Sequence, residues 1–203
     1  MTKSAIYLRE SATGKHVQAT LCDEVSDEHL KMWEAPWRPA MEAHCAKRTY
    51  HDTPEDAHWD WKTKATGWRS MVSSHSFAIV CRAELQGLMW ASDIESARLA
   101  AQFGKPLVYV KYLATAPWNR PEVQKPPRYR GVGTVLIAAA MQLSLDLEYE
   151  GRIGLHSLPA AERFYQNTFG MRALGRDAAC EDLMYFEMTE VQAKLFHRDR
   201  RKL

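Results

Sequence analysis

The sequence lacks long apolar runs and has little net charge. No window approaches the roughly 18 apolar residues that a membrane-spanning helix requires, and the N-terminal segment MTKSAIYLRE lacks the apolar run of a signal peptide. The formal net charge is only +2 over 203 residues, whereas nucleic-acid-binding proteins more often carry a strong basic excess. We therefore expect a cytoplasmic protein that has no membrane partner and does not bind nucleic acid.

Closely spaced cysteines are also missing. The four cysteines, at positions 22, 45, 81 and 180, form no CxxC pair, and the eight histidines form no HxxxH pair. Zinc sites usually show such spacings, so the sequence predicts no metal site. Isolated cysteines also give no disulfide framework, which fits a reducing compartment.

Apolar residues make up 46% of the chain, enough for a sizeable core, and they fall into short segments. Strand-like composition predicts strands at 4–10, 15–21, 75–82, 87–92, 106–115, 152–157 and 183–189. Helical patterns predict helices at 26–35, 95–104, 134–148 and 159–169, a short C-terminal helix, and helical tendency over 40–71.

Local signals set the expected ends of these elements. Pro36 and Pro39 are expected to end the first helix, and AELQ (83–86) is expected to form the turn between two strands. Strand 106–115 is apolar almost throughout, so we expect it inside the sheet. The order of elements predicts a mixed α/β (α+β) fold with a mostly antiparallel central sheet flanked by helices.

The stretch RYRGVGT (128–134), called the glycine turn below, carries the clearest chemistry. The first turn of a helix has about four unpaired N–H groups and a partial positive charge. Glycines before it let a ligand approach the backbone, and arginines suit phosphate oxygens. The pattern predicts a phosphate or pyrophosphate ligand, although a turn with two solvated arginines would look the same. A dinucleotide-binding fingerprint would need a glycine where Leu136 stands.

The surroundings of the glycine turn resemble a known family. R-x-x-G-x-G follows a strand that ends in YLAT, and an apolar helix, IGLHS and PAAERFYQNTFGM come after it. This ordered set resembles the GNAT superfamily of acyl-CoA-dependent N-acetyltransferases. The resemblance implies a single domain over 1–203, with a variable region at 1–74, a strand hairpin at 75–92, an acetyl-CoA-binding core at 106–172 and a basic tail at 196–203.

The resemblance implies acetyl-CoA as the cofactor. Backbone amides of the glycine turn would bind its pyrophosphate, and the end of strand 106–115 would pair with the pantetheine arm. The implied cofactor-binding residues are Leu113, Ala114, Thr115, Arg128, Tyr129, Arg130, Gly131, Val132, Gly133 and Thr134. Tyr165 matches the tyrosine that the family uses as general acid toward the departing thiolate. Where the family often has an asparagine, seven residues earlier, this chain has Leu158. The loop NRPEVQKPP (119–127) is longer than usual.

The acceptor amine must be neutral to attack a thioester, although the pKa of a free lysine-type amine is about 10.4. A base is therefore needed. His156 is a candidate base or a structural histidine, and Asp60 is a candidate acid or a solvated carboxylate. Tyr112 alternates with Lys111 on its strand, so one of the two should face the cleft.

Tryptophans concentrate before residue 70. Trp61 and Trp68 lie seven residues apart and would share one helix face. They can pack on the sheet, or they can form with Trp59 an aromatic wall that holds a cationic amine. Trp59, Trp61 and Tyr112 are therefore candidate substrate-binding residues.

The resemblance implies an enzyme that transfers an acetyl group from acetyl-CoA to an amine of a small molecule or peptide. The alternative is a catalytically weak or inactive acyl-CoA-binding sensor or partner module of the same fold. An acetyltransferase or toxin that modifies nucleic acid would need a more basic surface. The acceptor, the length of the acyl group and a homodimeric state stay open.

Overall fold

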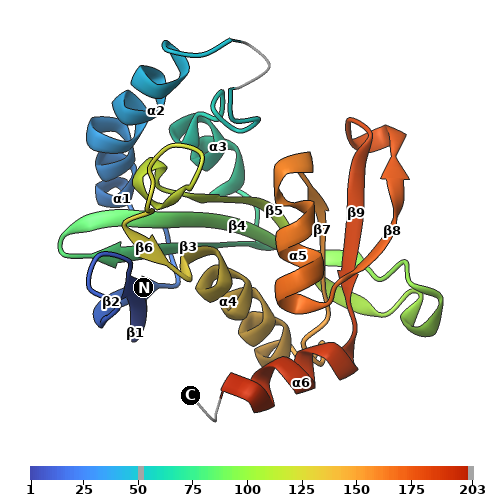
Figure 1. Ribbon diagram of the computed structural model, residues 1–203. Helices are drawn as coiled ribbons and strands as arrows, with labels where there is room; N and C mark the ends of the chain where they lie inside the picture. The colour runs from blue at the N-terminus through green and yellow to red at the C-terminus, as the bar shows by residue number, and fades with distance from the viewer. Residues whose placement is uncertain (50–52, 201–203) are drawn as a thin grey trace. The chain divides into compact units, whose positions relative to one another are not determined.

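The structure is a computed structural model that describes residues 1–49 and 53–200 (Figure 1). Its strands are β1 (Lys3–Glu10), β2 (His16–Cys22), β3 (Ser74–Cys81), β4 (Glu84–Ser96), β5 (Pro106–Thr115), β6 (Tyr129–Arg130), β7 (Ile153–Ser157), β8 (Arg172–Asp177) and β9 (Leu183–Met188). Its α-helices are α1 (Asp27–Met32), α2 (Arg38–Cys45), α3 (Trp61–Trp68), α4 (Val132–Asp146), α5 (Glu162–Phe169) and α6 (Glu190–Arg200).

The described strands form one mixed sheet in the order β6-β1-β2-β3-β4-β5-β7-β9-β8. Strands β5 and β7 pair in parallel, with Val108 opposite Ile153. The pairs β1–β2, β1–β6, β2–β3, β7–β9 and β8–β9 are antiparallel. The predicted fold class is confirmed, and the apolar strand β5 lies inside the sheet as expected.

By its contacts the chain divides into two compact units. The first unit comprises residues 1–90 and 112–136, and the second comprises residues 91–111 and 137–203. Strands β4 and β5 and helix α4 contribute residues to both units. The expectation of a single domain stays a prediction.

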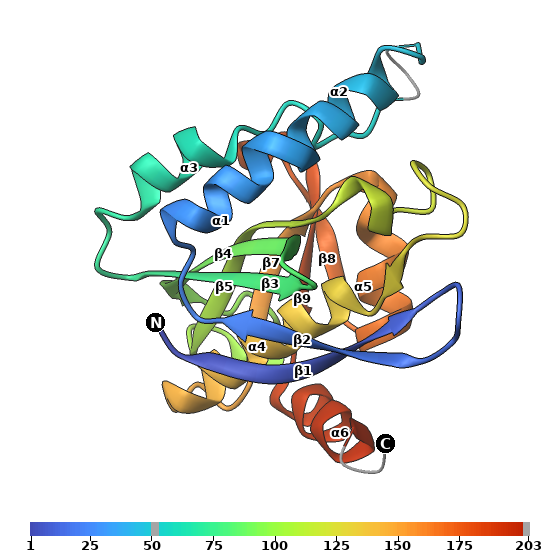
Figure 2. The same cartoon turned by 90° about the vertical axis from the view of Figure 1, so that its left-hand side faces the viewer.

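Tryptophan packing dominates the core of the first unit. Trp61 is 2% exposed and stacks on Trp90 with ring centroids 5.5 Å apart and an interplanar angle of 29°. Around them pack apolar residues of the N-terminal helices and of strands β3, β4 and β5. Figure 2 shows α1 and α2 in line with one another, beside α3, along one face of strands β3 and β4.

The helix at 26–35 does not end at its prolines. Ser26 caps α1 as expected, accepting a hydrogen bond from the backbone N–H of His29. A π-helical turn η1 (Trp33–Trp37) containing Pro36 then leads directly into α2, so the predicted break is wrong. A π-helical turn accommodates a local irregularity in the backbone hydrogen bonds of a helix. Burial of Trp33 and Trp37, four residues apart on one face, holds the irregular segment helical.

A buried carboxylate organises the second unit. Glu187 in β9 is fully buried and accepts hydrogen bonds from the backbone N–H groups of Arg98 and Leu99 at 2.7 and 3.1 Å. The side-chain amide of Gln102 donates to the same carboxylate at 2.7 Å. The predicted helix at 95–104 is therefore wrong: β4 continues to Ser96, and only a short 3-10 turn, η3 (Ala100–Gln102), follows.

Other boundaries also differ from expectation. The turn between β3 and β4 is Arg82–Ala83, both with positive φ, rather than AELQ, as in two-residue hairpin loops. Helical structure within 40–71 is limited to α2 and α3 among the described residues. Strands β6 and β8 were not predicted. Strand β8 lacks apolar alternation, and its register shifts between Ala173 and Arg176.

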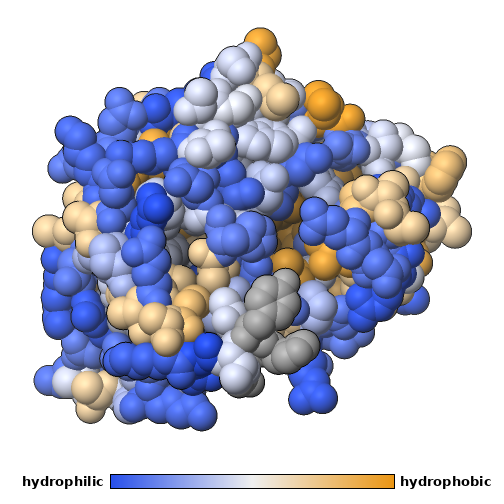
Figure 3. Space-filling model, turned by 90° about the horizontal axis from the view of Figure 1, so that it is seen from above, coloured by the Kyte–Doolittle hydropathy of each residue, from blue (hydrophilic) through white to orange (hydrophobic). Residues whose placement is uncertain are grey.

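The surface seen from above is largely hydrophilic, with hydrophobic residues in smaller patches (Figure 3). In the parts of the chain that the structure describes, every helix is too short or too polar to span a bilayer.

Glycine contacts give a test of the packing. A Cβ atom at Gly154 would lie 2.5 Å from the hydroxyl oxygen of Tyr185, which is buried and donates to Glu187. We expect Gly154→Ala to lower the free energy of unfolding by about 1–3 kcal/mol because the buried side chain must move. Urea denaturation of the variant and the wild type measures this.

The matched control is Gly67→Ala in the exposed part of α3, where a Cβ would meet no atom within 4 Å. We expect it to raise the free energy of unfolding by up to about 1 kcal/mol through helix propensity. Equal effects of the two substitutions would contradict the contact at Gly154.

Candidate functional site

Gly131 in the glycine turn is the N-cap residue of helix α4. Gly131 has φ of 90°, and its carbonyl accepts the backbone N–H of Val135 at 2.9 Å, the first hydrogen bond of the helix. A Cβ at Gly131 would meet nothing within 4 Å, so the backbone conformation, not crowding, requires glycine. The N–H groups of Val132, Gly133 and Thr134 have no acceptor within the helix. Such amides at the positive end of a helix bind anions.

A buried hydrogen-bond network holds the loop that leads into this turn. Gln86 is fully buried, and its Oε1 accepts the indole N–H of Trp118 and the amide N–H of Asn119, both at 2.9 Å. Asn119 Oδ1 in turn accepts the backbone N–H of Tyr129 at 3.0 Å. The carbonyl of Trp118 accepts the backbone N–H of Arg128 at 2.7 Å. Both ends of loop 119–127 are thereby tied to β4.

The two arginines of the turn have different surroundings. Arg128 forms an ion pair with Glu84, and its guanidinium lies 5.0 Å from the ring centre of Trp118. Arg130 is exposed in β6 and pairs across the sheet with Arg9 of β1, which is also exposed. Like charges directly opposite one another are unfavourable unless an anion neutralises them. Arg9 was not identified from the sequence, because only the β1–β6 pairing brings it here.

At the end of β5, one backbone carbonyl accepts a hydrogen bond from a side chain of the protein itself. Ala114 is buried, while Leu113 and Thr115 are half-buried. The carbonyl of Thr115 accepts Nε of Arg120 at 2.7 Å. Arg120 also binds both carboxylate oxygens of Asp56 at 2.6 Å, and both side chains are about 90% buried. Pairing of this strand end with pantetheine stays a prediction.

The first unit contains a pocket of about 270 Å³, called the tryptophan pocket below. Its lining is Trp33, Trp37, Arg38, Met41, Glu42, Asp56, Ala57, His58, Trp59, Asp60, Trp61 and Arg120. Trp59 and Trp61 are thus brought together in one cavity.

Tyr112 is not among the residues that line the tryptophan pocket. Its ring packs edge-on to Trp59 at 5.0 Å, and the ammonium of Lys64 lies 3.4 Å from its ring centre. Asp60 lines the pocket and also caps α3, accepting the backbone N–H of Thr63 at 2.8 Å. That hydrogen bond lowers the pKa of Asp60. The side chain is therefore an ionised carboxylate near neutral pH and has no proton to donate as a general acid.

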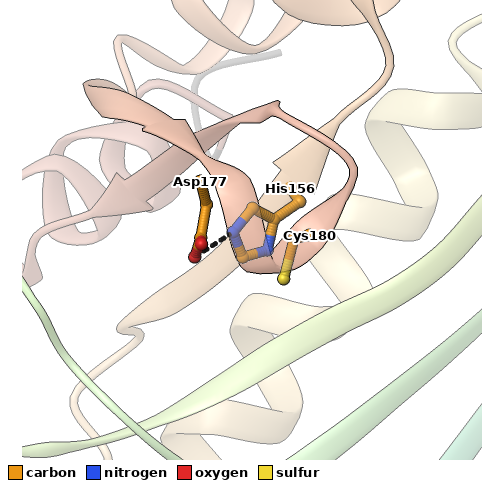
Figure 4. A group of neighbouring side chains, drawn as sticks. All are labelled: His156, Asp177 and Cys180. Carbon is orange, nitrogen blue, oxygen red and sulfur yellow. Dashed lines mark hydrogen bonds and ion pairs between the residues drawn. The ribbon is translucent and has the colours of Figure 1, made fainter.

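In the second unit, His156 has partners at both ring nitrogens. Nε2 lies 3.1 Å from Oδ2 of Asp177 (Figure 4). Nδ1 contacts the hydroxyl of Tyr109. The imidazole is 5% exposed, and burial lowers its pKa. A neutral ring that donates from Nε2 and accepts at Nδ1 satisfies both contacts.

Asp177 and Cys180 complete this cluster. Ligand atoms of His156, Asp177 and Cys180 lie within 4.8 Å of one another, a spacing that could admit a metal ion. Arg98, however, binds Oδ2 of Asp177 at 2.6 Å, and this hydrogen bond lowers the pKa of Asp177 to about 2. The positive charge of the Arg98 guanidinium disfavours binding of a metal ion to the carboxylate of Asp177. The expectation that the protein has no metal site stays a prediction.

Tyr165 lies in α5 of the second unit and is 6% exposed. Its ring packs against Phe164 at 5.2 Å and against Phe186 at 6.0 Å. Gly170 closes the helix in the left-handed conformation, as expected. Tyr165 and the glycine turn belong to different units, and the role of Tyr165 stays a prediction.

Comparison with known proteins relates the fold to solved structures. No family model and no curated protein matches the chain. The structure of FeeM, an N-acyl amino acid synthase from uncultured soil microbes, matches with a TM-score of 0.55 and 11% identity, covering 86% of this chain and 92% of that one. PaiA N-acetyltransferase from Thermoplasma acidophilum, in complex with coenzyme A, matches with a TM-score of 0.51 and 10% identity over 84% and 98%.

A third solved structure, described as a GNAT-family acetyltransferase from Desulfovibrio desulfuricans, matches with a TM-score of 0.53. Its identity is 13%, and the match covers 85% of this chain and 99% of that one. At such identities the likeness concerns the fold alone. This chain has the fold of the GNAT acetyltransferases.

Proposed function

We propose that this protein is an acyl-CoA-dependent N-acetyltransferase that moves an acetyl group from acetyl-CoA to an amine. The observation that carries the proposal is the glycine turn itself. In a chain with the GNAT fold, the first glycine of the R-x-x-G-x-G motif, Gly131, is the N-cap of α4 and has a positive φ, and the three amides that follow it have no acceptor in the helix.

The cofactor is held mainly by backbone groups. The amides of Val132, Gly133 and Thr134 bind the pyrophosphate, and the facing arginines of β1 and β6 supply positive charge. Arg128 acts indirectly, because its ion pair with Glu84 fixes the start of the turn. The strand end at Leu113–Thr115 pairs with the amide-bearing pantetheine arm.

The reaction requires two proton transfers. The neutral amine attacks the thioester carbonyl, a C–N bond forms, and the C–S bond breaks. Tyr165 then protonates the departing thiolate of coenzyme A. The base is His156 acting through Tyr109, whose hydroxyl takes the proton of the amine as it passes its own proton to Nδ1 of His156. Asp177 holds the imidazole in one orientation.

The first test concerns the anion site. Acetyl-CoA should raise the melting temperature, because a ligand at 100 times its Kd stabilises the folded state by about 2.7 kcal/mol. Arg130→Ala should weaken acetyl-CoA binding about tenfold or more, since it removes a charge-assisted contact. Calorimetric titration measures the Kd.

Arg172→Ala, which removes an exposed arginine of β8, is the matched control and should leave this Kd unchanged. If millimolar acetyl-CoA does not raise the melting temperature of the wild-type protein, the proposal is contradicted.

The second test separates catalysis from binding. Tyr165→Phe keeps the packed ring and removes only the hydroxyl, so we expect kcat to fall about 10²–10⁴-fold with an unchanged Kd for acetyl-CoA. Thiol release with an amine panel measures kcat. If the wild type binds acetyl-CoA without turnover, and Tyr165→Phe behaves identically, the protein is instead an acyl-CoA-binding module.

The third test concerns pH. Burial lowers the pKa of His156, so the base stays neutral, and active, at pH values below the ordinary histidine pKa of about 6.5. We expect the acidic limb of the kcat/KM profile to lie below pH ~6.5. His156→Gln should reduce kcat/KM and abolish this limb. A variant with wild-type activity and the same limb would exclude His156 as the base.

A further inference from the structure

The tryptophan pocket is built from three segments of the first unit. They are the helical run α1–η1–α2, the residues that lead into α3, and Arg120 after β5. Drug-sized ligands occupy pockets of about 300–1,000 Å³, and this pocket of about 270 Å³ lies just below that range. Its size suits a small molecule.

The walls of the pocket attract cations. Trp33, Trp37 and Trp61 are each 2–3% exposed, so their rings are fixed by the core. Two cations of the protein already lie over tryptophan rings that line the pocket: the guanidinium of Arg38 is 5.8 Å from the centre of Trp33, and the ammonium of Lys64 is 4.9 Å from that of Trp59. The geometry is that of cation–π contacts.

The charges of the lining do not balance. Asp56 and Arg120 neutralise one another through two hydrogen bonds of 2.6 Å. The remaining carboxylates, Glu42 and Asp60, share the single cation Arg38, at 2.9 and 3.7 Å. The carboxylates of the lining thus carry one negative charge more than its two arginines balance. A ligand with one positive charge would compensate it.

The pocket is also connected to the proposed cofactor strand. Arg120 lines the pocket and donates to the carbonyl of Thr115 at the end of β5. Arg120 is thus shared by the pocket and by the strand end to which we assign the pantetheine arm, and all of these residues belong to the first unit.

We infer that the tryptophan pocket binds the acceptor, and that the acceptor is a small primary amine that arrives as a monocation with an aromatic or apolar body. Only the role of the bound amine as the acetyl acceptor rests on the proposed acetyltransferase function. The binding site itself does not depend on that function. The tryptophans hold the body, and the carboxylates of Glu42 and Asp60 attract the ammonium.

The experiment uses the full chain without acetyl-CoA. 2-Phenylethylamine is the probe, and 2-phenylethanol is its neutral counterpart of nearly the same shape. Binding is followed by tryptophan fluorescence and by calorimetry. We expect the amine to bind about tenfold more tightly than the alcohol, because only the amine forms charge-assisted contacts.

Two variants locate the charge. Asp60→Asn keeps the cap of α3, because asparagine caps helices as well as aspartate does, and Glu42→Gln alters an exposed side chain of α2. Each should weaken binding of the amine about tenfold and leave binding of the alcohol unchanged. Glu28→Gln, which changes an exposed carboxylate of α1 outside the lining, is the matched control and should change neither.

The outcomes separate this inference from the proposed function. Equal affinities for amine and alcohol, or no effect of either pocket variant, overturn the inference even if acetyl-CoA binds. Failure of acetyl-CoA to bind overturns the proposed function while an amine that binds through Asp60 and Glu42 still supports the pocket. A Trp59→Leu variant with unchanged amine affinity would exclude Trp59 from the binding of the amine.

Discussion

The side-chain amide of Gln86 is the contact on which the anion site depends. It is fully buried in β4, and it joins the end of β3 to the loop after β5. Each of its hydrogen bonds replaces water that the interior excludes, and an unpaired buried group costs about 1–3 kcal/mol. The loop must therefore close onto β4 as a unit. Asn119 then passes this constraint to Tyr129, where the glycine turn begins.

The chain between 106 and 170 could be predicted because its signals are local. A β-branched strand, an N-cap glycine, an apolar helix and a left-handed glycine cap each follow from neighbouring residues. The two helix predictions that were wrong both involve distant partners. The helix expected at 95–104 gives way to hydrogen bonds from Glu187, and the prolines at 36 and 39 stay within a helical run because the tryptophans around them are buried. Strand β6 exists only through its pairing with β1.

The same distinction applies to the candidate site. The spacing of the glycines predicted an anion site at the start of α4, but no spacing could indicate that Arg9 lies opposite Arg130. The partners of His156 come from positions 47 and 21 residues away. For the tryptophans, the two interpretations left open by the sequence are compatible. Trp61 packs in the core against Trp90 and also lines the pocket.

The π-helical turn at Trp33–Trp37 makes chain length a determinant of the pocket. Such a turn contains one residue more than the α-helical repeat needs. Removing that residue would restore a regular helix and rotate everything after it by about 100° around the axis. Arg38, Met41 and Glu42 would then turn away from Trp59 and Asp60. Between Ser26 and Cys45 substitutions can therefore be accommodated more readily than insertions or deletions, so homologous proteins with the same pocket should keep this segment at constant length.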